Sequence, residues 1–328
     1  MNSQIPKIAP LDPETQAVID AMCAEGQPRI EDLTPQEARA WSQELFVPEP
    51  TPISVESITN HRIQVDGGTI RVRVYDPDPS TPLPIMVYLH GGGWVLGDLE
   101  SADSVVRRVV VDCHCIVVSV EYRLAPEFPF PVGYEDCLAA IRWTAEHASQ
   151  LGGVAGDPLA LGGDSSGGNL AAACAIALRD SDGPSLSCQY LAYPVTDADM
   201  GRPSMHEQVE KALERAAMIW FWDHYCPDLA QREDWRACPI KAKSLSQLPP
   251  ALVTLSSHDP LYDEGLEYAH RLQAADVPTT IRVAPDLIHG YLGMTQQSRR
   301  ADEEVGKVNA ILRTLVHQDP FPAGSSNG

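Results

Sequence analysis

Basic residues are scarce in this chain of 328 residues, which has 24 Lys and Arg against 45 Asp and Glu and a formal net charge of −21. A surface with such an excess of negative charge repels the phosphate backbone of nucleic acids, so we expect no nucleic-acid partner. With 44% hydrophobic and 21% charged residues, the composition is typical of a globular protein with a sizeable core.

Long apolar runs are also missing. No stretch of the sequence approaches the roughly 20 residues that a membrane-spanning helix needs. The first residues, MNSQIPKIAPLDPETQ, lack the apolar core of a secretory signal. These two absences predict a cytoplasmic protein without a membrane span.

Paired cysteine motifs are a third absence. The eight cysteines are scattered, and several lie within apolar runs, where a thiol acts as a small hydrophobic group. The segment Cys113-His114-Cys115 lacks the spacing of known zinc sites, and alternate strand residues point to opposite faces. We therefore predict buried free thiols, without a metal site or a disulfide framework.

Short apolar strands and amphipathic helices alternate from about residue 69 onward. The pattern predicts strands at 69–75, 84–89, 115–120, 158–163, 188–193, 251–255 and 279–284. It predicts helices at 101–112, 134–148, 167–180, 261–273 and 301–316. Continuous apolar strands separated by helices indicate an α/β fold, with a mostly parallel central sheet covered by helices on both faces.

Two regions interrupt this alternation. Near the N-terminus we predict two amphipathic helices, the second of which begins with the capping box Thr34-Pro35-Gln36-Glu37. A segment between the strands at 188–193 and 251–255 has little strand character, and its apolar helix at 211–225 either packs on the core or forms a lid over a pocket. The predicted division is 1–55 for the N-terminal cap helices, 56–196 and 247–317 for the α/β core, 197–246 for the insertion and 318–328 for a disordered tail.

The segment Gly163-Asp164-Ser165-Ser166-Gly167 matches the pattern G-x-S-x-G. A predicted strand precedes it and a predicted helix follows, so Ser165 falls on a sharp corner where only glycine fits between neighbouring backbones. A second match at 324–328 has neither neighbour. We therefore predict that Ser165 is a nucleophile at the head of a helix, whose free N–H groups face it.

A serine nucleophile needs a base, which is itself oriented by an acid. Suitable residues lie in two loops, SSHDPL at 256–261 and PDLIHG at 285–290, which follow the last two predicted strands. Strand ends of a parallel sheet meet at one edge, the same edge that presents Ser165. We favour His289 as the base over the other histidines, including His258. Asp259 is favoured as the acid over three other carboxylates, Asp263, Glu264 and Asp286.

The segment His90-Gly91-Gly92-Gly93-Trp94 follows the strand at 84–89. A flexible turn or a phosphate-binding loop are alternatives, but no Gly-Lys-Ser/Thr and no helix-initiating G-x-G-x-x-G accompany it. Three glycines let the backbone approach a substrate closely and point N–H groups at a developing oxyanion. Together with the Ser166 N–H, the Gly92 and Gly93 N–H groups are the predicted donors.

Four features in this order resemble the bacterial hormone-sensitive-lipase-like esterases (family IV) of the α/β-hydrolase superfamily. They are HGGGW at 90–94, EYRLAPE at 121–127, GDSSGGN at 163–169, and DPLYDEG at 259–265 with HG at 289–290. The resemblance covers about residues 56–316. It implies a carboxylic ester hydrolase that needs no cofactor, and a Ser165, Asp259 and His289 triad. The family usually has alanine after the nucleophile, where this chain has Ser166, whose backbone donor is unaffected.

The resemblance also implies a cap built from the N-terminal helices and the insertion, and substrates with short acyl chains or aryl groups. His90 and Gly91 are expected to support the oxyanion-binding loop. The side chains expected to line the pocket are those of Trp94, Trp41, Met218, Trp220 and Phe221. The resemblance is compatible with a homodimer, which no residue requires.

Two alternatives remain open at this point. The same triad serves the hydrolysis of amides, carbamates or acyl-peptides, because the acyl-enzyme chemistry is shared. A ligand receptor without activity is the other alternative, since plant gibberellin receptors resemble these esterases but have lost the catalytic histidine. The presence of His289 disfavours that second alternative.

Overall fold

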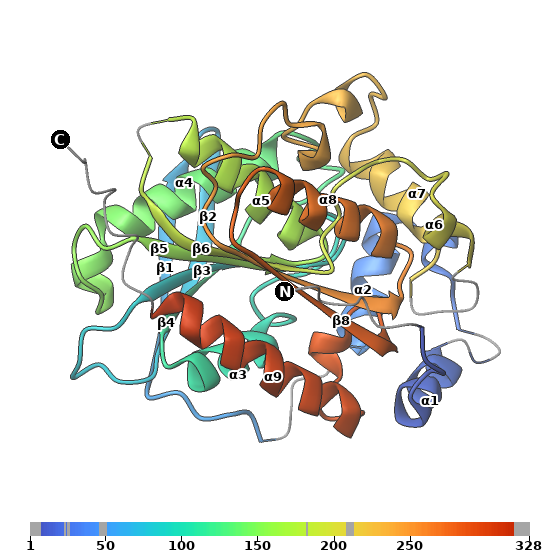
Figure 1. Ribbon diagram of the computed structural model, residues 1–328, viewed down its shortest axis with the longest axis horizontal. Helices are drawn as coiled ribbons and strands as arrows, with labels where there is room; N and C mark the ends of the chain where they lie inside the picture. Colours follow the sequence, from blue (N-terminus) through green and yellow to red (C-terminus); the bar gives the residue numbers. More distant parts are fainter. Residues whose placement is uncertain are drawn as a thin grey trace.

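The computed structural model describes residues 8–22, 24, 27–45, 51–181, 183–207 and 213–317. Within these residues, eight strands form one sheet in the order β1-β2-β4-β3-β5-β6-β7-β8 (Figure 1). The strands are β1 (Ser57–Val65), β2 (Gly68–Asp76), β3 (Ile85–Leu89), β4 (Ile116–Glu121), β5 (Leu159–Asp164), β6 (Leu186–Ala192), β7 (Ala251–His258) and β8 (Thr279–Ile288). The pairs β1–β2 and β2–β4 are antiparallel and the other neighbours are parallel, which confirms the predicted sheet.

Helices cover both faces of the sheet, as predicted. Helices α3 (Asp103–Cys113) and α9 (Arg299–Val316) lie on one face. On the other face lie α4 (Val132–Glu146), α5 (Ser166–Arg179) and α8 (Tyr262–Ala274) (Figure 1). Each face is packed by its own cluster of buried apolar side chains, and β3 is buried along its whole length. The α/β fold inferred from the alternation, with helices on both faces of a mostly parallel sheet, is therefore confirmed.

Strand β1 is absent from the sequence-based prediction, which began the sheet at about residue 69. Residues Ser57–Val65 are mostly polar, and among them Ile63 alone is buried, because β1 is an edge strand that pairs with β2. An exposed edge strand does not need the apolar run by which the other strands were recognised. The last two strands are also longer than predicted, since β7 extends to His258 and β8 to Ile288.

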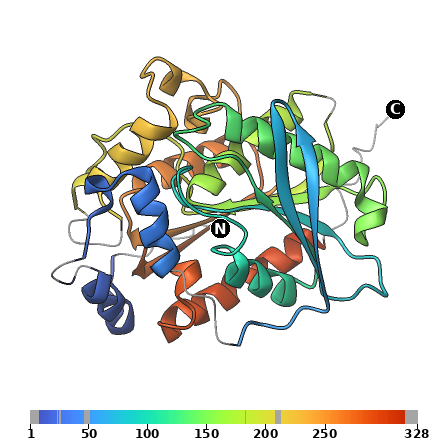
Figure 2. The ribbon, with the colours of Figure 1, turned by 180° about the vertical axis from the view of Figure 1, so that it is seen from behind.

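The N-terminal elements are α1 (Pro13–Met22), a short 3-10 helix η1 (Ile30–Asp32) and α2 (Pro35–Leu45). The predicted capping box is confirmed, because the Thr34 N–H donates to Glu37 Oε2 at 2.9 Å and the Glu37 N–H donates to Thr34 Oγ at 3.3 Å. Figures 1 and 2 show α2 near the edge of the sheet where β8 ends.

The insertion contains α6 (Pro203–Glu207), α7 (Arg215–Tyr225) and the 3-10 helices η3 (Gln231–Glu233) and η4 (Pro239–Lys241). Two contacts connect it with the N-terminal elements. The Trp220 indole N–H donates to the Leu33 carbonyl oxygen at 3.1 Å, and the Arg29 guanidinium lies 2.5 Å from the Glu214 carboxylate. The two irregular regions of the sequence are therefore in contact. The predicted tail at 318–328 lies outside the described residues.

The seven cysteines in the described ranges are buried and unpaired, which confirms the predicted free thiols, and Cys23 lies outside these ranges. Among the helices of those ranges, none combines the length and the apolar character that crossing a membrane requires.

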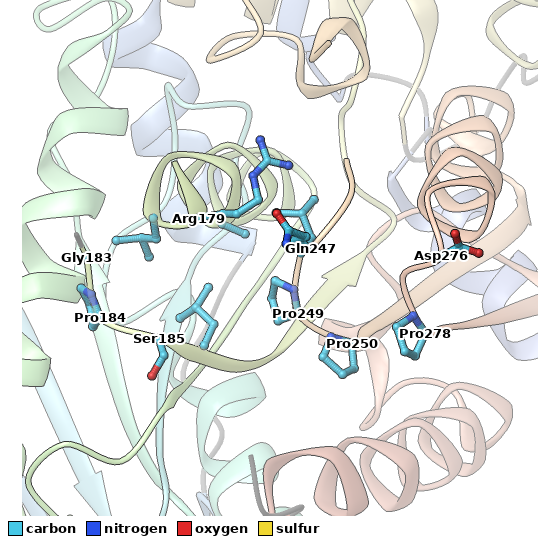
Figure 3. A pocket seen from close by; sticks show the side chains of 13 residues that line it. Arg179, Gly183, Pro184, Ser185, Gln247, Pro249, Pro250, Asp276 and Pro278 are labelled. Carbon is cyan, nitrogen blue, oxygen red and sulfur yellow. The ribbon is translucent and has the colours of Figure 1, made fainter. Parts of the chain in front are cut away.

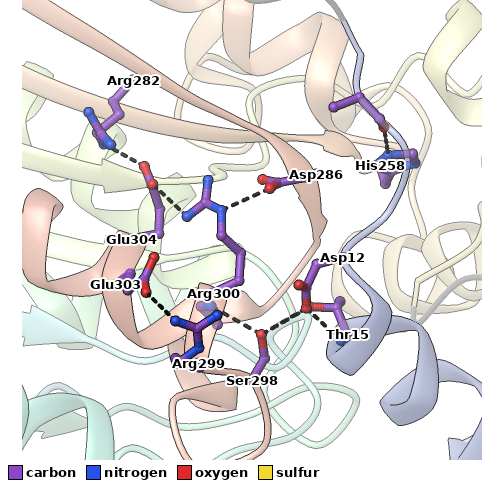
Figure 4. Close-up of polar contacts among 12 residues, drawn as sticks. Asp12, Thr15, His258, Arg282, Asp286, Ser298, Arg299, Arg300, Glu303 and Glu304 are labelled. Carbon is purple, nitrogen blue, oxygen red and sulfur yellow. Dashed lines mark hydrogen bonds and ion pairs between the residues drawn. The ribbon is translucent and has the colours of Figure 1, made fainter.

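A polar network connects α9 with β8 and with the N-terminal segment (Figure 4). The Glu304 carboxylate, which is 1% exposed, accepts hydrogen bonds from Arg282 on β8 and from Arg300 Nη1, the latter at 2.9 Å. Arg300 Nε also donates to Asp286 Oδ2 at 2.8 Å. Burial alone would raise the pKa of Glu304, but the hydrogen bonds from the two arginines outweigh it and leave the pKa below its usual value.

Replacement of Glu304 by alanine should lower the free energy of unfolding by about 2 kcal/mol, because two guanidinium groups lose a buried charged acceptor. The control Glu303→Ala removes an exposed pair with Arg299 and should change it by less than about 0.5 kcal/mol. Urea unfolding measures both.

The contribution of Glu304 to the free energy of unfolding should depend on pH. Since its folded-state pKa is lowered, this contribution is present above the ordinary glutamate pKa of about 4.3 and is lost as the pH falls through the folded-state pKa. Equal losses in the two variants would contradict this assignment.

Candidate active site

Ser165 lies at the corner between β5 and α5, with φ 54° and ψ −119°. A residue other than glycine rarely adopts such a conformation, which persists where its surroundings hold it. The Ser165 N–H donates to the Ala192 carbonyl oxygen at 2.8 Å. Its own carbonyl oxygen accepts from the N–H groups of Asn169 at 3.0 Å and Val195 at 3.2 Å. Hydrogen bonds to the backbone on both sides therefore keep this serine at the corner.

Two glycines allow the backbones of β3, β5 and α5 to meet at this corner. A Cβ atom added to Gly167 would lie 1.9 Å from the Leu89 carbonyl oxygen. One added to Gly163 would lie 2.5 Å from the Gly167 carbonyl carbon. Both distances are far below van der Waals contact, so neither position accepts a larger residue without movement of the backbone. Steric crowding therefore explains why both outer positions of the G-x-S-x-G pattern are glycine.

The side chains of Ser165, His289 and Asp259 form one hydrogen-bonded chain. His289 Nε2 lies 2.9 Å from Ser165 Oγ, and His289 Nδ1 lies 2.8 Å from Asp259 Oδ2. With the Nδ1 proton directed at the carboxylate, Nε2 is left to accept the serine proton. The three residues come from the carboxyl ends of β5, β7 and β8, which meet at one edge of the sheet.

The Asp259 carboxylate is 1% exposed and has further donors. Its Oδ1 accepts from the Leu261 N–H at 2.8 Å, and its Oδ2 accepts from the Ser256 hydroxyl at 3.3 Å. These bonds orient the carboxylate toward the imidazole. The His289 ring also contacts the ring of Tyr193, with 4.6 Å between the ring centroids. Sequence reasoning missed Tyr193, which appeared as the last residue of a predicted strand.

The rival acids and bases of the sequence analysis have other partners. His258 Nε2 lies 2.9 Å from the Ala9 carbonyl oxygen, in the N-terminal segment (Figure 4). Asp286 pairs with Arg300 at 2.8 Å. The remaining two carboxylates contact the insertion: Asp263 accepts from the Ser204 N–H at 2.8 Å and Glu264 accepts from the Asp197 N–H at 3.2 Å.

The glycine loop, residues 90–97, follows β3 and lies beside the corner. Three consecutive residues of it have positive φ angles, Gly92 at 114°, Gly93 at 59° and Trp94 at 60°. The Gly92 carbonyl oxygen accepts from the N–H groups of Val95 at 3.2 Å and Leu96 at 2.8 Å. Among the residues described here, the Gly92 and Gly93 N–H groups have no acceptor. Ser166 is the first residue of α5, where an N–H has no partner within the helix.

Asp164, beside the motif serine, connects the corner with the glycine loop. Its Oδ1 accepts from the Gly91 N–H at 3.0 Å and from the Tyr88 hydroxyl at 2.8 Å. Burial raises the pKa of this carboxyl group, although the donors favour its ionised form. Sequence reasoning did not single out Asp164. The available signal was a carboxylate inside the G-x-S-x-G pattern, where it must lie next to the nucleophile.

His90 and Tyr122 form the base of the glycine loop. The two rings stack with 4.4 Å between their centroids, and the Tyr122 hydroxyl donates to the His90 carbonyl oxygen at 2.8 Å. His90 Nδ1 lies 2.7 Å from the Gly91 carbonyl oxygen. Burial lowers the pKa of His90, so the neutral imidazole is favoured.

The five side chains expected at the pocket lie in different environments. Phe221 of α7 lies against the glycine loop, because a Cβ added to Gly93 would be 2.1 Å from its ring. Trp94 is 1% exposed and stacks on Tyr225, with 4.1 Å between the centroids. The other three occupy α2 and α7: Trp41 is half-buried, whereas Met218 and Trp220 are buried.

A cavity of about 670 Å³ lies at the opposite edge of the sheet (Figure 3). The residues at its wall come from the end of α5 and from the starts of β6, β7 and β8, and include Arg179, Leu186, Pro250 and Pro278. Ser165 and its partners lie at the carboxyl ends of the strands, so this cavity is separate from them. In the described part of the chain, no three His, Cys, Asp or Glu side chains gather as metal ligands would.

Several curated proteins resemble this chain along most of its length. Carboxylesterase NlhH of Mycobacterium tuberculosis is 41% identical over 289 residues, which cover 85% of this chain and 89% of that protein. An ethyl acetate hydrolase of Pseudomonas putida is 38% identical over 272 residues, covering 81% and 83%.

Solved structures and a family model also match this chain. A thermostable esterase from Pseudomonas putida superposes with a TM-score of 0.89 at 32% identity, over 97% of this chain and 100% of that one. An α/β-hydrolase enzyme from the metagenome of Lake Arreo has a TM-score of 0.88 at 36% identity, over 93% and 98%. Residues 86–293 match the model of a family described as having the alpha/beta hydrolase fold. This chain therefore belongs to the hormone-sensitive-lipase-like carboxylesterases of the α/β-hydrolase superfamily.

Proposed function

We propose that this carboxylesterase hydrolyses its substrates through an acyl-enzyme, with Ser165 as nucleophile, His289 as general base and acid, and Asp259 as the orienting carboxylate. The observation that supports this most is the continuous chain of hydrogen bonds from Asp259 through His289 to Ser165, with distances of 2.8 and 2.9 Å. Such a chain activates a hydroxyl that is otherwise a weak nucleophile.

In the first half of the reaction, Ser165 Oγ attacks the ester carbonyl carbon while His289 Nε2 takes the hydroxyl proton. Asp259 keeps the imidazole in the required tautomer and stabilises its charged form. The tetrahedral intermediate then collapses, the bond to the leaving alcohol breaks, and His289 returns the proton to that alcohol. In the second half, a water molecule gives a proton to His289 and attacks the acyl carbon, which forms a second tetrahedral intermediate. As this collapses, the bond to Ser165 Oγ breaks, His289 returns the proton to that oxygen, and the carboxylic acid leaves.

The negative oxygen of both tetrahedral intermediates needs N–H donors, for which we propose Gly92, Gly93 and Ser166. The Gly92 and Gly93 N–H groups have no acceptor among the described residues, and the Ser166 N–H has none within helix α5. All three lie beside the Ser165 corner. Loss of one such donor typically costs about 10²–10³ in rate. The Ser166 hydroxyl is fully buried, so substrate has no access to it as a second nucleophile.

The proposed substrates are esters with short acyl chains, or aryl esters. Phe221 of the insertion lies on Gly93 of the glycine loop, so the space beside the proposed donors is limited on that side. Two relatives have names in keeping with small esters, the ethyl acetate hydrolase described above and an arylesterase of Saccharolobus solfataricus, 31% identical over 319 residues. Amide, carbamate or acyl-peptide hydrolysis remains the alternative, since it uses the same triad.

Substitution of Ser165 by alanine should lower the turnover of p-nitrophenyl esters by about 10⁴–10⁶-fold, because the acyl-enzyme cannot form. The release of p-nitrophenol measures this directly. The chain offers a matched control in the second G-x-S-x-G segment at 324–328, where Ser326→Ala should keep wild-type turnover. Equal rates for wild type and Ser165→Ala would refute the proposed nucleophile.

A panel of p-nitrophenyl esters with increasing acyl length, together with matched p-nitroanilides, tests the substrate class. For acyl chains of about two to six carbons, kcat/KM should be at least about tenfold higher than for chains of twelve or more, a difference of about 1.4 kcal/mol in transition-state binding. The esters should also exceed the matched anilides. A preference for anilides would favour the amidase alternative, and a preference for long chains would contradict the limited space beside Phe221.

A further inference from the structure

Arg39, on the N-terminal helix α2, contacts the glycine loop at Val95, two residues after Gly93. Its Nε donates to the Val95 carbonyl oxygen at 2.9 Å, and its Nη2 donates to the Ala125 carbonyl oxygen at 2.7 Å. Val95 belongs to the glycine loop, whereas Ala125 lies in the segment EYRLAPE that follows β4. One guanidinium group therefore connects two loops that lie far apart in the sequence.

The contact with Val95 falls on a strained turn. Gly92, Gly93 and Trp94 all have positive φ angles, and the Val95 N–H closes the turn on the Gly92 carbonyl oxygen at 3.2 Å. Trp94 is not a glycine, so its conformation persists where surrounding contacts hold it. Its carbonyl oxygen accepts from the Ala125 N–H at 2.9 Å. Arg39 completes this arrangement by binding the next carbonyl of the turn and the carbonyl of Ala125 itself.

Two further donors of Arg39 are bound by Glu127. Arg39 Nη1 donates to Glu127 Oε1 at 2.8 Å and Nη2 donates to Oε2 at 2.7 Å, a two-pronged pairing that fixes the plane of the guanidinium group. The hydrogen bonds from Arg39 lower the pKa of Glu127 to about 2, so the carboxylate stays charged at any pH suited to ester hydrolysis. A lysine at this position has one nitrogen and cannot reproduce the fork.

From these contacts we propose that Arg39 is a positioning residue for the glycine loop. Through Arg39, helix α2 holds the Gly92 and Gly93 N–H groups in place. The inference rests on the proposed function. It does not make Arg39 a catalytic residue, because Arg39 acts through the Val95 and Ala125 carbonyl groups. Donors that are already oriented stabilise the transition state without reorganisation, whereas a loose turn loses this advantage and leaves substrate binding largely unchanged.

The variants Arg39→Ala and Arg39→Lys test this proposal by steady-state kinetics on a p-nitrophenyl ester. For Arg39→Ala we expect kcat to fall about tenfold to a hundredfold, less than the 10²–10³ lost with a donor itself, while KM stays within about threefold. Arg39→Lys should recover part of kcat. The matched control is Arg29→Ala, which removes an exposed N-terminal link to Glu214 and leaves the glycine loop untouched, and should keep wild-type kcat.

A trifluoromethyl ketone provides a second measurement, because its adduct with Ser165 carries a negative oxygen that needs the same donors. Its inhibition constant should rise in parallel with the loss of kcat/KM across the Arg39 variants. If Arg39→Ala does not fold, Glu127→Gln keeps both carbonyl contacts but weakens the fork, and should show a smaller loss of kcat in the same direction.

A rise in KM alone, or equal losses in Arg39→Ala and Arg29→Ala, would overturn the proposal, since both outcomes indicate general anchoring of the N-terminal region. Unchanged kcat in Arg39→Ala, with an inactive Ser165→Ala, would overturn the positioning role and leave the proposed function intact. Full activity in Ser165→Ala would instead refute the proposed function itself.

Discussion

The positive φ angle of Ser165 is the constraint on which the arrangement of the site depends. It is possible because Gly163 and Gly167 let the corner approach the backbone of β3, where any side chain would collide with the Leu89 carbonyl. The same approach brings Asp164 within hydrogen-bond distance of the Gly91 N–H. One corner of the chain therefore sets both the proposed nucleophile and the start of the loop with the proposed oxyanion donors.

The second requirement is that distant segments meet at one edge of the sheet. Asp259 and His289 reach Ser165 because β5, β7 and β8 are parallel and end together. Further contacts surround these strand ends and loops: Tyr193 contacts the His289 ring, Phe221 lies on Gly93, and Arg39 donates to the Val95 carbonyl oxygen of the glycine loop. The N-terminal helices thus contribute to the site although none of their side chains belongs to the proposed triad.

Much of this could be predicted from the sequence, because apolar strands alternate with helices and because a G-x-S-x-G corner has a steric signature. The G-x-S-x-G pattern between a strand and a helix indicates Ser165, and the loops after the last two predicted strands contain Asp259 and His289. Strand β1 could not be recognised, since an edge strand has little need of apolar residues. The contacts of Tyr193 and Arg39 could not be predicted either, because each joins segments that are remote in sequence, 56 residues apart for Arg39 and Val95. No local pattern records such contacts.

The most direct test of the account is to trap the proposed covalent intermediate. Treatment with diethyl p-nitrophenyl phosphate should release p-nitrophenol and leave one diethylphosphoryl group on the protein, and peptide mass spectrometry locates it. We predict a single adduct at Ser165 that forms in proportion to the loss of esterase activity. An adduct at another residue with equal loss of activity, or inactivation without any adduct, would contradict it.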